Sequence, residues 1–173
     1  MSILEWFRSM AASEAPGDTD TVRRIAAALD QIDEPRARYL AAFAYVLSRV
    51  AGADLQVSEA EMNAMREIVQ RVGELSDDQA RLVVDIARTQ NRRWGGTEDF
   101  LVTREFRSLA SEDECRTLLG CLFAVSAADD TISGDEEAQI RQIARELGVP
   151  DGEYRAVRLK HADKLTTLRQ QDR

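Results

Sequence analysis

The chain has 173 residues, of which 31 are acidic and 23 are basic, so its formal net charge is −8 at pH 7. This length supports one domain with its own core, and the negative charge disfavours binding to nucleic acid or to anionic lipid. One histidine and two cysteines exclude a histidine-rich metal site, a disulfide framework and a four-cysteine zinc site. We expect Cys115 and Cys121 to be small buried side chains of a cytoplasmic protein.

Residues 1–20 are predicted to form a short N-terminal helix and a linker. The apolar residues of the first ten follow helical spacing, and a polar stretch rich in helix breakers covers 13–20. The segment has neither the basic start nor the long apolar run of a signal peptide. Because Arg8 is the one basic residue of this helix, we expect it to fold onto the protein rather than to contact a membrane.

Residues 21–173 are predicted to form a single all-α domain of about eight helices. Apolar residues recur with helical spacing throughout, and no segment alternates with a period of two. Four serines precede an acidic or amide residue by three positions, the pattern of a capping box: Ser58, Ser76, Ser111 and Ser133. Gly73 and Gly148 indicate helix ends, and residues 92–97 indicate a loop.

An internal repeat connects the two halves of this domain, about 35–75 and about 110–150. When the sequence is shifted by 75 residues, apolar positions fall on apolar positions. Four polar or glycine positions are identical across the shift: Asp54 and Asp129, Ser58 and Ser133, Glu61 and Glu136, and Gly73 and Gly148. Two copies are too few for a solenoid, so we expect two helical pairs packed face to face around a pseudo-twofold axis.

Each repeat carries the pattern Asp-x-x-Val/Ile-Ser-x-x-Glu between two helices. Glu61 and Glu136 take the third helical position of a capping box, which is enough to explain them. Asp54 and Asp129 follow the C-terminal end of a helix, where free carbonyl groups already make the field negative. Each therefore needs compensation, from a divalent cation, from a nearby arginine or from the hydrogen bonds of an Asx-turn.

Oxygen ligands of this kind suit calcium or magnesium. The second loop is nevertheless no EF-hand: counted from Asp129, Gly134 falls at position six, but Ile140 falls at position twelve, where a bidentate glutamate is required. A metal site would therefore draw its ligands from both loop and helix, or from both repeats. His161 is predicted to be a surface residue rather than a catalytic base.

The repeated motif resembles that of the TerB-like family, which includes the tellurite-resistance protein TerB and the N-terminal domain of certain membrane-anchored DnaJ-like co-chaperones. The resemblance runs from about residue 35 to 157 and implies a duplicated helical bundle. It also implies a metal site built from the acids of the motif: Asp54, Glu61, Asp129 and Glu136. The glycine expected after each Asp is Leu55 in the first repeat and Asp130 in the second, which adds a carboxylate. Asp adopts the left-handed backbone conformation at modest cost, and Leu much less readily.

Our leading hypothesis is a non-enzymatic, cytoplasmic bacterial protein that binds a divalent cation weakly on an acidic face and engages a protein partner. Asp54, Asp129 and Asp130 would neutralise the ion, while Glu61 and Glu136 would complete its shell and cap their helices. A role in tellurite resistance or stress response is implied by the resemblance alone. The alternative is a metal-free helical interaction module. A hydrolytic metalloenzyme is disfavoured, because the sequence indicates neither a general base nor a substrate pocket.

Overall fold

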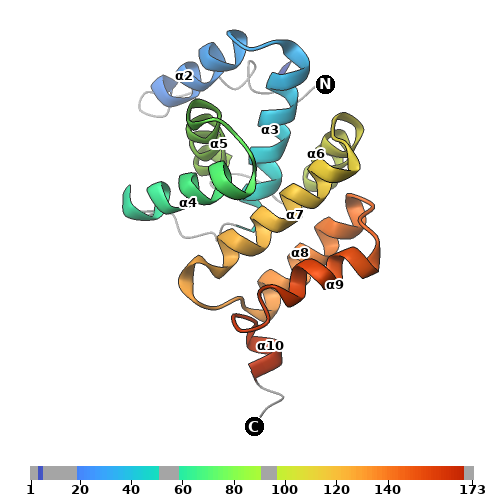
Figure 1. The fold of residues 1–173 in the computed structure, drawn as a ribbon. Coiled ribbons are helices and arrows are strands. Elements are labelled where there is room, and N and C mark those ends of the chain that lie inside the picture. Colours follow the sequence, from blue (N-terminus) through green and yellow to red (C-terminus); the bar gives the residue numbers. More distant parts are fainter. Residues whose placement is uncertain (1–3, 6–18, 51–58, 91–96, 170–173) are drawn as a thin grey trace.

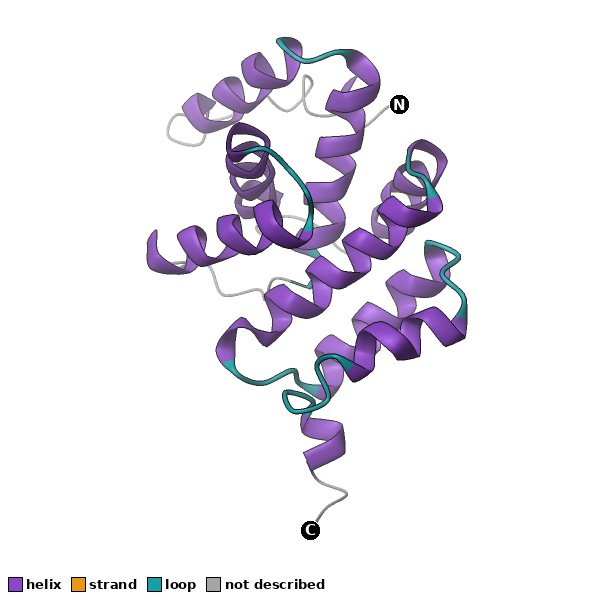
Figure 2. Ribbon diagram, in the orientation of Figure 1, coloured by secondary structure: helices purple, strands orange, loops and turns teal. Residues whose placement is uncertain are grey.

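The computed structural model describes residues 4–5, 19–50, 59–90 and 97–169. This part of the chain is helical and contains no strand (Figures 1 and 2), which confirms the all-α prediction. The elements are α2 (Thr19–Asp30), α3 (Glu34–Ser48), α4 (Glu59–Val72), α5 (Asp77–Gln90), α6 (Thr97–Leu109), α7 (Glu112–Ser126), the 3₁₀ turn η1 (Ala127–Asp129), α8 (Gly134–Glu146), α9 (Asp151–Leu159) and α10 (Thr166–Arg169).

Helix α3 is the centre of the N-terminal half. Residues 39–47 are all buried, as expected for a helix that is apolar on every side. It packs against α2, α5, α6 and α7. The ring of Phe106 on α6 lies 5.1 Å from that of Tyr39 and 6.1 Å from that of Phe43, between ring centroids. These aromatic contacts fix α6 against α3.

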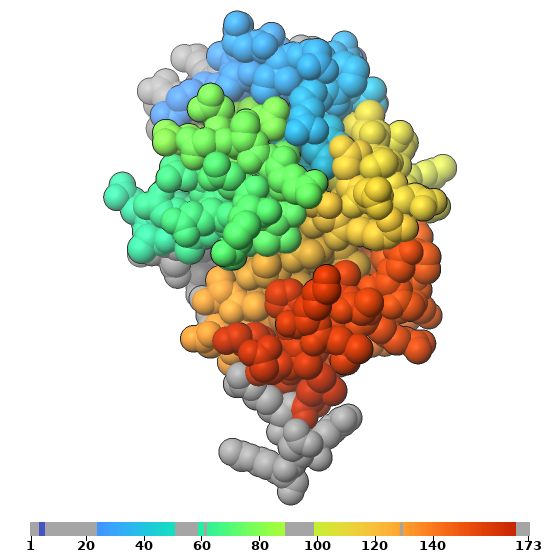
Figure 3. All heavy atoms as spheres, viewed as in Figure 1, coloured from blue at the N-terminus to red at the C-terminus, as the bar shows by residue number. Residues whose placement is uncertain are grey.

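Helix α7 connects the two halves and crosses the middle of the molecule in Figure 1. It packs against α3 and α4 on the N-terminal side and against α8 and α9 on the C-terminal side. Its buried residues include both a central leucine cluster and the thiols of Cys115 and Cys121, which confirms the predicted burial of the two cysteines. In Figure 3 the N-terminal and C-terminal halves form contiguous blocks that meet along α6 and α7.

A buried ion pair joins the end of α3 to the end of α8. Arg49 Nη1 lies 2.6 Å from Glu146 Oε2, and the two side chains are only 3% and 8% exposed. The same guanidinium donates to Thr103 Oγ1 at 2.6 Å, and Asp99 of α6 lies 3.8 Å away. Burial alone would raise the pKa of Glu146, but the hydrogen bond and charge of Arg49 hold it below its ordinary value.

The helix ends follow most of the signals in the sequence. Complete capping boxes start α7 at Ser111 and α8 at Ser133, and the Gln79 N–H donates to Ser76 Oγ at 3.3 Å. Gly148 ends α8 with φ of 71°. After α4 the left-handed residue is Glu74, with φ of 56°, rather than Gly73. A Cβ on Gly73 would lie 2.3 Å from the Val69 carbonyl oxygen, so close approach explains this glycine.

Helix positions in the structure can be compared with the segments predicted from the sequence. Helix α2 begins at Thr19, inside the stretch predicted as linker, because Thr and Asp are accepted at a helix start. Leu4 is 4% exposed and belongs to the core, while residues 6–18 lie outside the described part. Shifted by 75, α4 corresponds to 134–147, and α8 spans Gly134–Glu146. The internal duplication and its pseudo-twofold axis stay predictions.

Candidate cation-binding loop

The second acidic motif, residues 129–136, covers the loop between α7 and α8 and the start of α8, and it lies within the described part of the chain. Helix α7 tightens into η1, and Asp130 then ends this turn with φ of 64° and ψ of 1°. Its N–H donates to the Ala127 carbonyl at 3.0 Å. Asp130 thus adopts the left-handed conformation that Asp accepts at modest cost, and it turns the chain sharply toward Ser133 at the start of α8.

The carboxylate of Glu136 is engaged at the start of α8. Its Oε2 accepts from both the backbone N–H and the hydroxyl of Ser133, each at 2.8 Å. In return the Glu136 N–H donates to Ser133 Oγ at 3.2 Å. The capping box therefore accounts for this glutamate without a metal. Any cation ligand would then have to come from the start of the loop, just after η1.

At the start of the loop, the carboxylate of Asp130 is 87% exposed and contacts an ammonium group. Lys164 Nζ donates to Asp130 Oδ1 at 2.7 Å. Lys164 comes from the segment that follows α9 and precedes α10. This contact is a charge-assisted hydrogen bond, a class that is shorter and stronger than hydrogen bonds between neutral groups.

The backbone of the same segment pairs with the loop. The Ile132 N–H donates to the Lys164 carbonyl at 2.7 Å, and the Thr166 N–H donates to the Ile132 carbonyl at 3.0 Å. Ile132 and Leu165 form an isolated parallel bridge, and both are fully buried. The loop is therefore built by two segments that lie more than 30 residues apart in the sequence.

A comparison with protein families gives a match to the model of the tellurite resistance protein TerB over residues 38–159. This range covers well over half of the chain. The chain belongs to the TerB family. Searches of curated proteins and of solved structures found no match. The resemblance inferred from the acidic motif is thus confirmed at the level of the family, and the matched range ends before Lys164.

Two of the five predicted ligands of this TerB domain have described side chains, Asp130 and Glu136. They lie at opposite ends of one loop and have separate partners, Lys164 and Ser133. Asp54 lies outside the described residues. Glu61 and Asp129 are placed only by their backbones, in α4 and η1. Among the described residues no group of three His, Cys, Asp or Glu side chains is arranged to hold a metal ion.

The structure adds a group that the sequence reasoning missed, around Glu137. This residue is 5% exposed, and it accepts from Arg158 Nε and from Thr167 Oγ1, each at 2.5 Å. Burial alone would raise the pKa of Glu137, but these hydrogen bonds hold it below its ordinary value. The sequence pattern does not indicate that Glu137 is buried, because it is one of three consecutive acidic residues in the first turn of α8.

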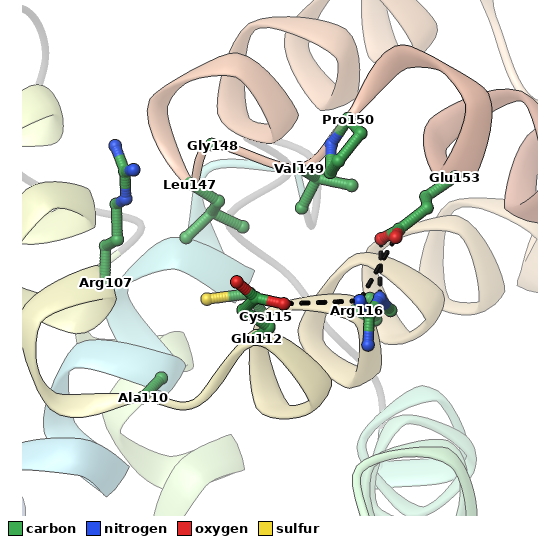
Figure 4. A pocket seen from close by; sticks show the side chains of 10 residues that line it. All are labelled: Arg107, Ala110, Glu112, Cys115, Arg116, Leu147, Gly148, Val149, Pro150 and Glu153. Carbon is green, nitrogen blue, oxygen red and sulfur yellow. Dashed lines mark hydrogen bonds and ion pairs between the residues drawn. The ribbon is translucent and has the colours of Figure 1, made fainter.

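A pocket of about 250 Å³ lies at the other end of α7, between α6, the α8–α9 turn and the start of α9 (Figure 4). One wall carries the pair of Arg116 and Glu153, joined at 2.5 and 3.1 Å, and the opposite wall carries Arg107. Arg107 packs over Gly148, so its charge lies near the C-terminal ends of α6 and α8. Arg116 and Glu153 thus neutralise each other within the chain.

His161 lies half-buried rather than on the open surface. Its ring stacks on Phe123 with 5.6 Å between centroids and 9° between planes. Burial lowers the pKa of His161, the nearby Lys160 lowers it further, and Asp163 opposes them. The prediction of a surface residue was therefore wrong in its burial, because the turn after α9 folds back onto α7.

Proposed function

We propose that this TerB protein acts without catalysis, by binding a divalent cation, calcium or magnesium, weakly at the loop of Asp129, Asp130 and Glu136. The corresponding loop of Asp54 and Glu61 would form the second half of the site. The observation that carries the proposal is the exposed Asp130 carboxylate with a positive group, Lys164 Nζ, held 2.7 Å from it. Carboxylate, carbonyl and hydroxyl oxygens are the ligands that these hard cations prefer.

The chain would use this acidic face to engage a protein partner in the cytoplasm of a bacterium. A net charge of −8 disfavours nucleic acid as that partner. No helix in the described ranges has the length and apolar character needed to cross a membrane. A connection with tellurite resistance rests on the family's name, and we propose it only as a context for the binding function.

One observation favours a second candidate, a metal-free helical interaction module. Ser133 already engages Glu136, and Lys164 already neutralises Asp130, so the described acids of the motif have partners within the chain. In this case the loop would be a structural connection between α7 and α8. The two candidates differ in whether the stability of the protein depends on a divalent cation.

Thermal unfolding of chelator-treated protein, with and without millimolar calcium, magnesium, manganese or zinc, separates the candidates. A ligand present at a hundred times its dissociation constant adds about 2.7 kcal/mol of stability, which raises Tm by roughly 5–10 °C for a domain of this size. The rise should disappear in Asp129→Asn and in Asp130→Asn. It should persist in Asp151→Asn, which removes an exposed acid at the start of α9. No rise with any ion would favour the metal-free module.

A further inference from the structure

Contacts on both sides of Lys164 hold the segment after α9 against helix α7 and the loop. After it, Leu165 is fully buried, and Thr166 bonds to Ile132 through its N–H at 3.0 Å and through its hydroxyl at 3.1 Å. Before it, the His161 ring stacks on Phe123 of α7. These contacts fix the backbone of Lys164 beside the loop, whatever its side chain does.

The ammonium of Lys164 lies beside the carboxylate of Asp130. It lies 2.7 Å from Asp130 Oδ1, close to the distance of about 2.3–2.6 Å at which carboxylate oxygens coordinate calcium. A divalent ion bound to this oxygen would lie within a few ångströms of the ammonium, and two positive charges at that separation repel each other. The side chain of Lys164 is 30% exposed, so it has room to swing into solvent.

We propose that Lys164 is a built-in counter-cation of the loop, which a divalent cation must displace before it binds. This inference rests on the proposed function and adds a regulation to it. The lysine raises the cation concentration needed to fill the loop, and cation binding in turn changes the environment of the segment after α9. Residues 38–159 match the family model, so Asp130 lies inside that match and Lys164 lies outside it.

The chain contains only two lysines, Lys160 and Lys164, which offers a matched pair of variants. Lys164→Met removes the ammonium and keeps the apolar stem, while Lys160→Met makes the same change of charge at an exposed position four residues away. Calorimetric titration of the full chain with calcium and magnesium should show a two- to five-fold tighter dissociation constant for Lys164→Met. This factor is about what an exposed ion pair is worth. Lys160→Met should change it by clearly less.

A second measurement follows the lysine itself. Reductive methylation with ¹³C-formaldehyde labels the two lysines and the terminal amine, and NMR resolves their methyl signals. On titration with calcium or magnesium, the signal assigned to Lys164 should move toward that of Lys160, as its ammonium leaves Asp130 for solvent. The signal of Lys160 should stay in place.

The outcomes distinguish this inference from the proposed function. Cation binding by the natural chain, with equal effects of the two lysine variants and no shift of the Lys164 signal, overturns the inference and leaves the proposed function standing. Binding by Lys164→Met alone supports the inference in its strongest form. The absence of binding by the natural chain and by both variants overturns both proposals together.

Discussion

At Asp130 a residue with a side chain occupies the left-handed backbone region, and this single position shapes the whole loop. The conformation costs roughly 1–2 kcal/mol for most residues with a Cβ, and less for Asp, whose short side chain bonds locally. This cost arises at the position where the TerB-like motif has glycine. The Asp130 side chain that replaces the glycine places a carboxylate beside Lys164.

The backbone cost at Asp130 is testable with two substitutions. Asp130→Gly and Asp130→Ala both remove the carboxylate, so they lose the contact with Lys164 equally. The glycine variant should be more stable by about 1 kcal/mol in urea unfolding, because only alanine keeps the Cβ. At Glu67, an exposed position inside α4, the order should reverse, with alanine more stable by about 0.8–1 kcal/mol. Equal stability of the two Asp130 variants would contradict the left-handed turn.

Among the elements, α3 and α8 depend on the buried pair of Arg49 and Glu146. A buried charge that loses its partner costs far more than the pair contributes when intact. Arg49→Met should therefore destabilise the protein by about 3–5 kcal/mol, measured by chemical unfolding. Arg38→Met, which breaks the partly exposed pair with Glu105, should cost less than about 1 kcal/mol.

The double variant Arg49→Met/Glu146→Met supplies the decisive comparison. Removing both charges leaves neither one unpaired, so the double variant should be more stable than the sum of the single losses implies. Strict additivity of the two losses would show that the pair is not coupled in solution.

The sequence predicted elements well and long-range partners poorly, for a physical reason. Helical spacing and serine caps are local patterns, so the all-α class, the boxes at Ser111 and Ser133 and the turn at Gly148 were readable. Arg49 and Glu146 are 97 residues apart, and Asp130 and Lys164 are 34 apart. Such pairs depend on how helices pack, which one sequence does not show. Of the candidate site, the loop and its acids were predicted, while its lysine was not.

For the molecule as a whole, pH should act on stability through two buried carboxylates and one half-buried histidine. The pKa of Glu137 and of Glu146 lies below the ordinary value of 4.5. Their contribution is therefore complete above about pH 4.5 and is lost as the pH falls through their folded pKa. His161 acts at higher pH, since its folded pKa lies below 6.5. The unfolded chain takes up the proton first, so stability decreases as the pH falls below about 6.5.

His161 is the one histidine of the chain, so it should dominate this dependence between about pH 5 and 7. In urea unfolding, the natural protein should be equally stable at pH 8 and 7 and less stable at pH 5.5. At pH 5.5 the histidine of the unfolded chain binds a proton more readily than the ring stacked on Phe123, and this favours the unfolded state. His161→Phe keeps an aromatic ring against Phe123 and removes the titration. Its unfolding free energy should stay level over the same range and decrease only below about pH 4.5, where Glu137 and Glu146 begin to titrate. A decrease from pH 7 to 5.5 as large as that of the natural protein would assign the dependence to other groups and would contradict the lowered pKa of the half-buried His161.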